Sequence, residues 1–392
     1  MLAVRLARRL WLAYRYPLLA FCISRLALLV VVYLGLAMVP LASGEGLWRV
    51  FPDNLFLDGF GRWDSGWYFP IAENGYTNFL IPALKGQKDT AFFPAYPFLL
   101  SIVGSLGWRG MQLWGIAASN FLFGLGLCFL FDISKFFCNT RVARLAVSLA
   151  AFSPFSIFFS SIYTESLFFA ASTASFWFSI RSQLAWAMLA ASLASVTRVV
   201  GIICVPFAFL SFYFPAPLGS QASRQKRRLG PLILPATLTG ASLLFLHLIY
   251  LQLRFGNAFQ FVLSQRVWAT ESGLTKLLAT WYPVFDLENV FKGQFNVMGI
   301  VNSASLAVAG SLVVLCFVRR WLPLSLSVWS LLTILVSSSL WFSGGRFISS
   351  IFPLYVMLAL LLRRCPAELV VGVSALLMSL FAFLFSHWYW VA

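Results

Sequence analysis

The run PLLAFCISRLALLVVVYLGLAMVP, residues 17–40, decides the class of fold. Its only charged side chain is Arg25, and a helix of about 20 apolar residues is enough to cross the hydrocarbon core of a bilayer. The run follows an arginine-rich stretch but is too long for the apolar part of a signal peptide. We therefore interpret it as a retained first membrane helix.

Comparable apolar runs recur along the rest of the chain. Apolar residues make up 60% of the sequence and charged residues only 10%. Since no soluble core could hide so many runs, and since a bilayer requires internally satisfied backbone groups, we expect an all-α polytopic membrane protein forming one domain over residues 1–392. About eleven spans are predicted, near residues 17–40, 111–131, 143–161, 164–180, 182–197, 199–214, 231–253, 297–318, 322–342, 346–362 and 366–387.

The formal net charge of +16 reflects membrane topology. Basic residues fall between the apolar runs, and a cytoplasmic N-terminus places sixteen of the 28 on the inside, with only Asp132 and Glu368 of the twelve acids. This bias obeys the positive-inside rule. The basic run at residues 224–228 is accordingly read as an orientation signal, and no nucleic-acid partner is expected.

Two longer segments, 41–110 and 254–296, fall on the opposite, outer face. Six of the twelve acids lie between Glu45 and Asp89 in the first segment, among many aromatic residues. Tryptophan and tyrosine favour the membrane interface, so we expect short interfacial helices in this first outer loop. Pro70 is expected to interrupt any continuous helix there.

The cysteines and histidines suggest no cofactor. None of the six cysteines lies in the outer segments, so no disulfide framework is expected. The two histidines, His247 and His387, are isolated and lack the spacing of metal ligands. We expect no metal site and no cofactor.

Charged residues at the outer ends of apolar runs mark the candidate site. By the charge count Asp64, Glu165, Arg198 and Arg346 share one membrane face, and charges in such a setting need partners or a wet cavity. Arg25, within the first run, needs a partner for the same reason. Asp64 suits either a helix N-cap or a catalytic carboxylate, and Glu165 either a buried ion pair or a substrate contact.

Several motifs resemble the PIG-V family, which comprises GPI mannosyltransferase 2 and its bacterial homologues. The first is Arg-Trp-Asp…Ile-Ala-Glu-Asn-Gly-Tyr…Ala-Phe-Phe-Pro-Ala-Tyr-Pro at 62–97, and the second is Ser-Pro…Phe-Phe…Tyr-Thr-Glu-Ser-Leu-Phe at 153–168. Thr-Arg-Val-Val-Gly at 197–201 is a third, and later matches begin at Arg254 and at Gly345. The resemblance implies a GT-C-type bundle.

The resemblance also implies a glycosyltransferase that takes a hexose, usually mannose, from a polyprenyl (dolichyl)-phosphate donor on the outer or lumenal face and gives it to a lipid-linked or glycolipid acceptor. Asp64 would be the general base in an inverting reaction, and arginines would offset the charge of the leaving phosphate. No metal is required by this scheme. The residues expected to bind substrate are Arg62, Trp63, Glu73, Tyr76, Phe93, Tyr163, Glu165, Arg198, Arg254 and Arg346.

Other functions share some of these features. A GT-C enzyme that moves another sugar or glycosylates protein is the nearest, and a transporter could use the same intramembrane charges, although no internal repeat pairs two halves of the chain. The resemblance places the protein in a bacterial plasma membrane, or in the endoplasmic reticulum membrane if the source is a eukaryote.

Overall fold

The structure is a computed structural model that describes residues 2–41, 50–51, 53–77, 80–81, 86–104, 108–214, 233–266, 282, 287–293, 296–338 and 343–391. Its helices in chain order are α1 (Leu2–Met38), α2 (Leu55–Asp58), α3 (Ser65–Asn74), α4 (Ala95–Gly104), α5 (Trp108–Phe137), α6 (Thr140–Ala151), α7 (Glu165–Ile180), α8 (Leu184–Ser195), α9 (Cys204–Tyr213), α10 (Ile233–Phe255), α11 (Gln260–Gln265), α13 (Leu287–Phe291), α14 (Val297–Arg319), α15 (Leu324–Ser338), α16 (Gly344–Ser349), α17 (Pro353–Leu362) and α18 (Ala367–Ser386). Short 3₁₀ turns are η3 (Asp89–Ala91), η4 (Ser156–Phe159) and η5 (Val199–Ile203).

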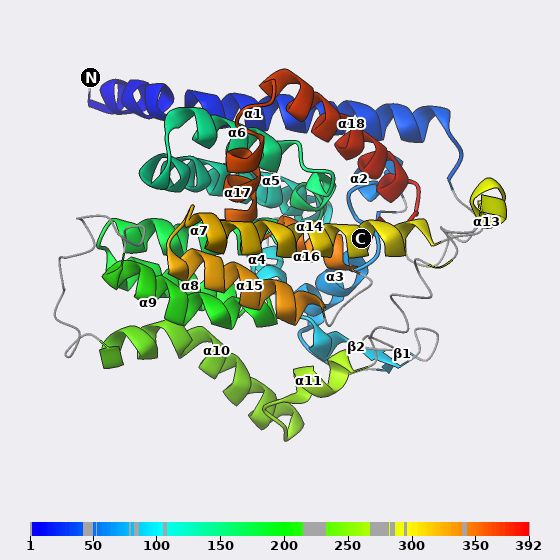
Figure 1. Cartoon of the computed structure of the whole chain (residues 1–392). Coiled ribbons are helices and arrows are strands. Elements are labelled where there is room, and N and C mark those ends of the chain that lie inside the picture. Colours follow the sequence, from blue (N-terminus) through cyan, green and yellow to red (C-terminus); the bar gives the residue numbers. More distant parts are fainter. Residues whose placement is uncertain are drawn as a thin grey trace.

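Five of the described helices, α1, α5, α10, α14 and α18, are long and apolar enough to cross a membrane. Shorter apolar helices, among them α8, α15 and α17, run in the same bundle (Figure 1). The helical, membrane-spanning character expected from the sequence is thus confirmed, and each of the eleven predicted segments contains helix. The number of spans stays a prediction.

The bundle is layered around α7, which packs between α5 and α8, while α10 covers the outer side of α8 (Figure 1). Aromatic rings fill the centre: Phe123 of α5 stacks on Phe159 of η4 with their centroids 4.4 Å apart. At the opposite edge α1 packs along α18.

Arg25 joins α1 to this core. Its guanidinium is buried and donates hydrogen bonds to the Ser156 carbonyl at 3.2 Å and to Ser160 Oγ at 2.8 Å. The irregular segment after α6 therefore supplies the hydrogen-bond partners that an intramembrane arginine requires.

Four details differ from the sequence-based expectations. The predicted span 346–362 is divided between α16, which ends at Ser349, and α17, which begins at Pro353. The predicted span 143–161 is not one helix, because α6 ends at Ala151 and the residue before Pro154 is disfavoured in helical conformation. Pro70 does not interrupt α3, where the burial of Trp67 and Ile71 outweighs one missing backbone hydrogen bond. The described residues also include an antiparallel pair of two-residue strands, β1 (Leu80–Ile81) and β2 (Gln87–Lys88), so the fold is not strictly all-α.

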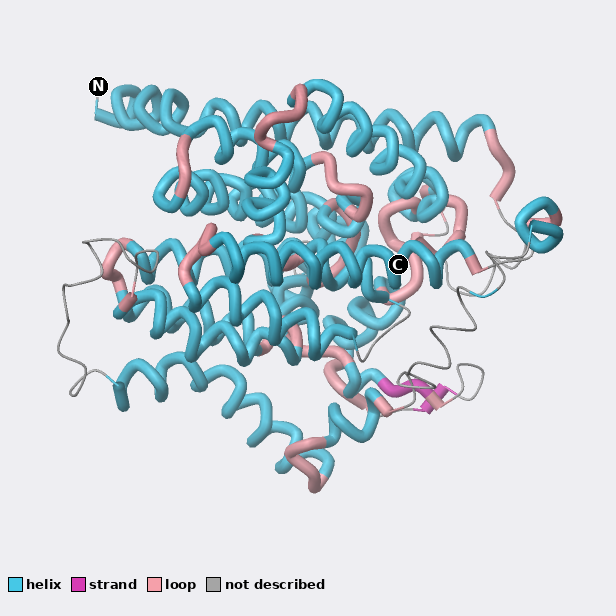
Figure 2. Tube along the Cα trace, viewed as in Figure 1, coloured by secondary structure: helices cyan, strands magenta, loops and turns pink. Residues whose placement is uncertain are grey.

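The first outer loop does contain short helices, α2, α3 and α4, as predicted. Figure 2 shows the β1–β2 pair beside α11 at one end of the bundle, and α11 contacts both β2 and η3. The basic run at 224–228 lies outside the described residues.

Candidate active site

The turn before α3 holds Asp64 in place. Trp63 has a positive φ of 54°, a conformation that is unusual for a bulky residue and therefore needs support from its surroundings. The Tyr163 hydroxyl supplies it by donating to the Arg62 carbonyl at 2.9 Å and accepting from the Asp64 amide at 3.2 Å. Burial and the nearby Asp64 carboxylate raise the pKa of Tyr163, which keeps the donor proton on its hydroxyl at neutral pH.

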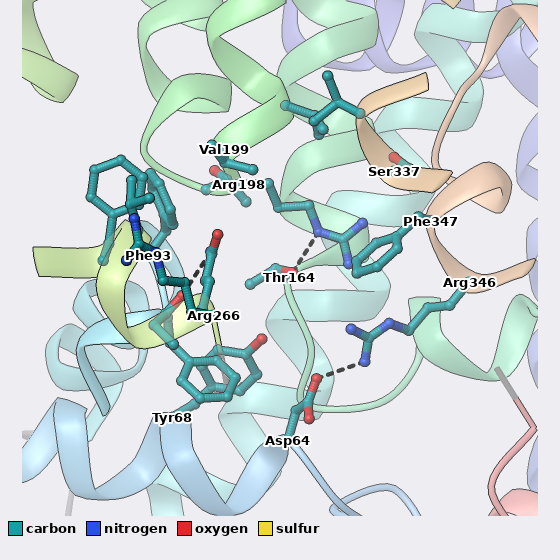
Figure 3. Close-up of a pocket in the computed structure, with 18 residues that line it drawn as sticks. Asp64, Tyr68, Phe93, Thr164, Arg198, Val199, Arg266, Ser337, Arg346 and Phe347 are labelled. Carbon is teal, nitrogen blue, oxygen red and sulfur yellow. Dashed lines mark hydrogen bonds and ion pairs between the residues drawn. The ribbon is translucent and has the colours of Figure 1, made fainter. Parts of the chain in front are cut away.

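The carboxylate of Asp64 does not cap α3. Although Asp64 is the N-cap residue, its side chain makes no capping hydrogen bond. It instead accepts a charge-assisted hydrogen bond from Arg346 Nη1 at 2.6 Å (Figure 3). The helix-cap interpretation is therefore wrong.

A second ion pair adjoins the first. Glu165, at the start of α7, is fully buried and pairs with Arg198 Nη2, while Arg346 Nε lies 3.2 Å from the same carboxylate oxygen. Arg198 also donates from Nε to Thr164 Oγ1 at 2.8 Å. The predicted grouping of Asp64, Glu165, Arg198 and Arg346 is thus confirmed, and its two positive and two negative groups balance in charge.

Asp64, Arg198 and Arg346 line a cavity of about 440 Å³, whereas the buried Glu165 is not among its lining residues. In Figure 3, Asp64, Arg198 and Arg346 lie to the right of Phe93 and Arg266, and the lining also includes apolar side chains from η5, α11 and α15. The cavity is lined by Asp64, Tyr68, Ala91, Phe92, Phe93, Thr164, Thr197, Arg198, Val199, Val200, Phe261, Val262, Gln265, Arg266, Val336, Ser337, Arg346 and Phe347. Such a shape suits a ligand with an anionic group and an apolar chain.

A tryptophan cluster flanks the pair Asp64–Arg346. The Trp63 ring meets Trp388 and Trp390 edge-on, with centroid distances of 5.6 and 5.4 Å. The Trp390 ring centroid lies 5.6 Å from Arg346 Cζ. We call Trp63, Trp388 and Trp390 the tryptophan cluster. Trp63 is 36% exposed, so the cluster presents an accessible aromatic surface next to the carboxylate.

The other residues predicted to bind substrate are distributed unevenly. Phe93 lines the cavity. Tyr76 is buried and donates to the Phe92 carbonyl at 2.7 Å, so it supports the cavity wall from behind.

Arg62, Glu73 and Arg254 do not line the cavity. Arg62 is completely buried, pairs with Asp58 and donates to the Ser386 carbonyl at 2.9 Å, so its guanidinium serves the packing of α2 against α18. Glu73 and Arg254 are exposed. Their predicted contact with substrate stays a prediction.

The sequence analysis missed Tyr68, Arg266 and Phe347. Burial, reinforced by the Asp64 charge, raises the pKa of Tyr68, so its hydroxyl remains protonated. Arg266, at the end of α11, adds a third guanidinium to the cavity lining. Arg266 lies in the part of the chain that follows the match beginning at Arg254, but unlike Arg198 it does not lie between apolar runs, so the sequence pattern did not mark it.

The fold and site together define a class: multi-pass integral membrane proteins of the GT-C fold with a charged cavity at one end of the bundle. Two structures of the oligosaccharyltransferase of Archaeoglobus fulgidus share this fold, one a complex with zinc and sulfate and the other tethered to an acceptor peptide. The TM-scores are 0.50 and 0.52 at 14% and 12% identity, covering 94% and 97% of this chain and 53% and 56% of the other.

Sequence comparison identifies the family. Residues 47–270 match the family described as Mannosyltransferase (PIG-V), and the chain belongs to that family. GPI alpha-1,6-mannosyltransferase 2 of Cricetulus griseus is 32% identical over 166 residues, which cover 38% of this chain and 31% of the relative. GPI mannosyltransferase 2 of Schizosaccharomyces pombe is 28% identical over 225 residues, covering 53% and 46%. The matches thus span less than half the length of these two relatives.

Proposed function

We propose that this chain transfers mannose from a polyprenyl-phosphate donor to a hydroxyl of a lipid-linked or glycolipid acceptor. The observation that carries the proposal is the position of Asp64, which lines a cavity shared with Arg198 and pairs with the buried Arg346 instead of capping its helix. Membership of the PIG-V family supports mannose as the sugar. The names of the relatives favour a GPI precursor as acceptor in a eukaryotic host.

The two parts of the donor match the two kinds of residue that line the cavity, the arginines and the apolar side chains. Its phosphate would lie against Arg198 and Arg346, whose guanidinium groups can each form two parallel hydrogen bonds to phosphate oxygens. Its polyprenyl chain would follow the apolar lining residues Val199, Phe261 and Val336. Arg266 stands near enough to the same space to contact the phosphate or the sugar.

The acceptor would approach from the tryptophan cluster. An aromatic face offers an apolar surface to the C–H groups of a sugar ring, and this one adjoins Asp64. A sugar stacked there would present its hydroxyl to the carboxylate while the donor occupies the cavity. The two substrates would then meet at Asp64.

The chemical step follows from this placement. The acceptor oxygen attacks the anomeric carbon, the bond from that carbon to the phosphate oxygen breaks with inversion, and Asp64 accepts the hydroxyl proton. Arg198 and Arg346 offset the charge that develops on the departing polyprenyl phosphate. The step requires no metal ion or cofactor, because the arginines supply the positive charge and phosphate is a good leaving group.

The test is transfer of radiolabelled mannose from synthetic polyprenyl-phosphomannose to a membrane-lipid extract by the purified chain in nanodiscs. Asp64→Asn should lower the rate by about 10²- to 10⁴-fold, the usual contribution of a general base. Asp53→Asn is the matched control, since Asp53 is an exposed carboxylate of the same outer loop. Equal rates for wild type and Asp64→Asn would remove Asp64 as base. If wild type transfers no mannose, glucose or arabinose donors and peptide acceptors would be tested next, followed by substrate uptake into vesicles as expected for a transporter.

A further inference from the structure

A second cavity, of about 350 Å³, is enclosed by α1, α6 and the connection from α17 to α18. Three arginines line it: Arg141 and Arg144 from the first turns of α6, and Arg363 from the end of α17. The remaining lining residues are Tyr16, Thr140, Val142, Leu145, Ser148, Cys365, Ala367 and Val371, which include no carboxylate. We call this space the basic cavity. It takes no part in the mechanism above.

The guanidinium groups of the basic cavity are available to a ligand. None of the three is in an ion pair within the described part of the chain, whereas the nearby Arg181 is paired with Asp132 at 2.9 Å. Glu368, in the first turn of α18, is exposed and does not line the cavity. Three like charges gathered around one hollow repel each other unless an anion lies between them.

The wall of the basic cavity is fixed by packing. The Tyr16 hydroxyl lies 2.9 Å from Ser148 Oγ, and the Arg144 guanidinium carbon lies 5.3 Å from the Tyr16 ring centroid. This contact holds one arginine against a rigid aromatic ring and reduces the conformational freedom that ligand binding would otherwise cost.

The basic cavity lies at the opposite end of the bundle from Asp64. The α1 helix rises about 28 Å between Tyr16 and Gly35, which is close to the thickness of a bilayer core. At the far end, His387 Nε2 is 3.1 Å from the Gly35 carbonyl, and Arg62 bonds to Ser386 of the same α18 turn. Figure 1 shows α1 and α18 running along each other between these ends. The basic cavity therefore lies near the membrane surface that the charge bias predicts to be cytoplasmic.

The exposed faces of α1 and α18 beside the basic cavity are apolar and therefore suit lipid chains. Leu369, Val373 and Leu376 of α18 are 63%, 51% and 70% exposed, at a spacing that places them on one face. On α1, Leu12 and Leu19 are 57% and 48% exposed. A ligand with an anionic head and acyl chains would fit the arginines and these apolar faces together.

We propose that the basic cavity binds the phosphate headgroup of an anionic phospholipid in the leaflet opposite the candidate active site. Basic pockets between membrane helices on the cytoplasmic side are suited to such headgroups. A free phosphate ion shares the head chemistry but would not use the apolar faces of α1 and α18. This proposal is independent of mannose transfer, so either proposal can be contradicted without affecting the other.

The test measures lipid retention by native mass spectrometry of the full chain, with phosphatidylglycerol and phosphatidylcholine supplied in equal amounts. Wild type should retain phosphatidylglycerol preferentially. The triple variant R141Q/R144Q/R363Q should lose about tenfold or more of that preference, as expected when several arginine contacts to an anionic headgroup are removed. The control R319Q/R320Q/R364Q makes the same change in charge at exposed arginines that do not line the basic cavity, and it should keep the preference.

Equal losses in the two triple variants would overturn the proposal, because they would indicate general attraction to the leaflet. Displacement of the lipid by millimolar inorganic phosphate would show that the basic cavity takes a free anion. A second measurement needs no variant of the arginines: Cys365 lines the basic cavity and is exposed, so phosphatidylglycerol should slow its reaction with a maleimide relative to phosphatidylcholine nanodiscs. The same rate in both lipids would also overturn the proposal.

Discussion

Two aspartates only six residues apart have opposite surroundings. Asp58 is completely buried, pairs with Arg62 and accepts from the Phe51 amide at 3.1 Å. Asp64 lies at the rim of a cavity and shares Arg346 with Glu165. Both are aspartates, but Asp58 is held by partners close in sequence, Arg62 and Phe51, whereas Asp64 pairs with Arg346, which is 282 positions away.

Asp58→Asn should therefore lower stability more than it lowers catalysis. Removing one partner of a buried ion pair leaves an uncompensated charge, which costs about 3–5 kcal/mol of unfolding free energy. Thermal unfolding in nanodiscs should show this loss, while mannose transfer per folded molecule falls far less than in Asp64→Asn. Asp53→Asn should change the unfolding free energy by less than about 0.5 kcal/mol, as is usual for surface sites. A stable Asp58→Asn variant without activity would contradict this division.

Trp63 should act on the acceptor. Trp63→Ala removes the most accessible ring next to Asp64 and should raise KM for the acceptor by about tenfold or more with a smaller effect on kcat, the signature of lost uniform binding. Trp63→Phe should restore part of the affinity. Steady-state kinetics against acceptor concentration measure both, with Trp186→Ala of α8, which is 60% exposed, as control. A fall in kcat at constant KM would argue against acceptor stacking.

At the scale of elements, the break between α8 and α9 places Arg198. The sequence predicted this break, because Arg198 separates two short apolar halves, and the structure shows Arg198 in extended conformation at the N-cap of η5. The sequence did not predict how closely η5 returns to α8. A Cβ built at Gly201 would overlap the carbonyl of Ala194.

Gly201→Ala should displace η5 and with it Arg198. We expect a marked loss of mannose transfer together with a lower melting temperature. The added Cβ would clash with the backbone of Ala194, which cannot move aside as a flexible side chain can. Gly310→Ala in α14 is the matched control, since no atom lies within 4 Å of the added Cβ and alanine favours helix. Parallel assays and melting curves of the two variants provide the measurement. Normal activity in Gly201→Ala would show that the close approach does not position Arg198.

At the scale of the whole molecule, the sequence predicted which residues share a membrane face but not which of them touch. Charge bias and apolar runs depend on local sequence, so the helical segments and the grouping of Asp64 with Arg346 could be predicted directly. The actual pairs join residues far apart: 282 positions separate Asp64 from Arg346, and 324 separate Arg62 from Ser386. Arg62 was assigned to substrate because no local pattern reveals its buried contact with α18.

The topology can be tested with thiol reagents. Cys365 is exposed at the end where the basic residues of α6 and α17 gather, and Asp53 is exposed in the first outer loop. An impermeant maleimide should label Cys365 only from the cytoplasmic side of sealed vesicles, and an Asp53→Cys variant should gain a site labelled only from the outer side. The opposite sidedness would invert the orientation predicted by the positive-inside rule.

The hydrogen bonds from Arg62 to Ser386 and the contacts of Trp63 with Trp388 and Trp390 have a consequence for biosynthesis. The ribosome delivers the segment around Asp64 early, and Tyr163, whose hydroxyl supports the turn, follows before α7. Ser386, Trp388 and Trp390 arrive only after the described helices α1–α17 have been made. A chain still emerging from the insertion machinery would therefore contain Asp64 but not these contacts of the neighbouring Arg62 and Trp63. We therefore expect mannose transfer to begin only once Ser386, Trp388 and Trp390 have packed against Arg62 and Trp63.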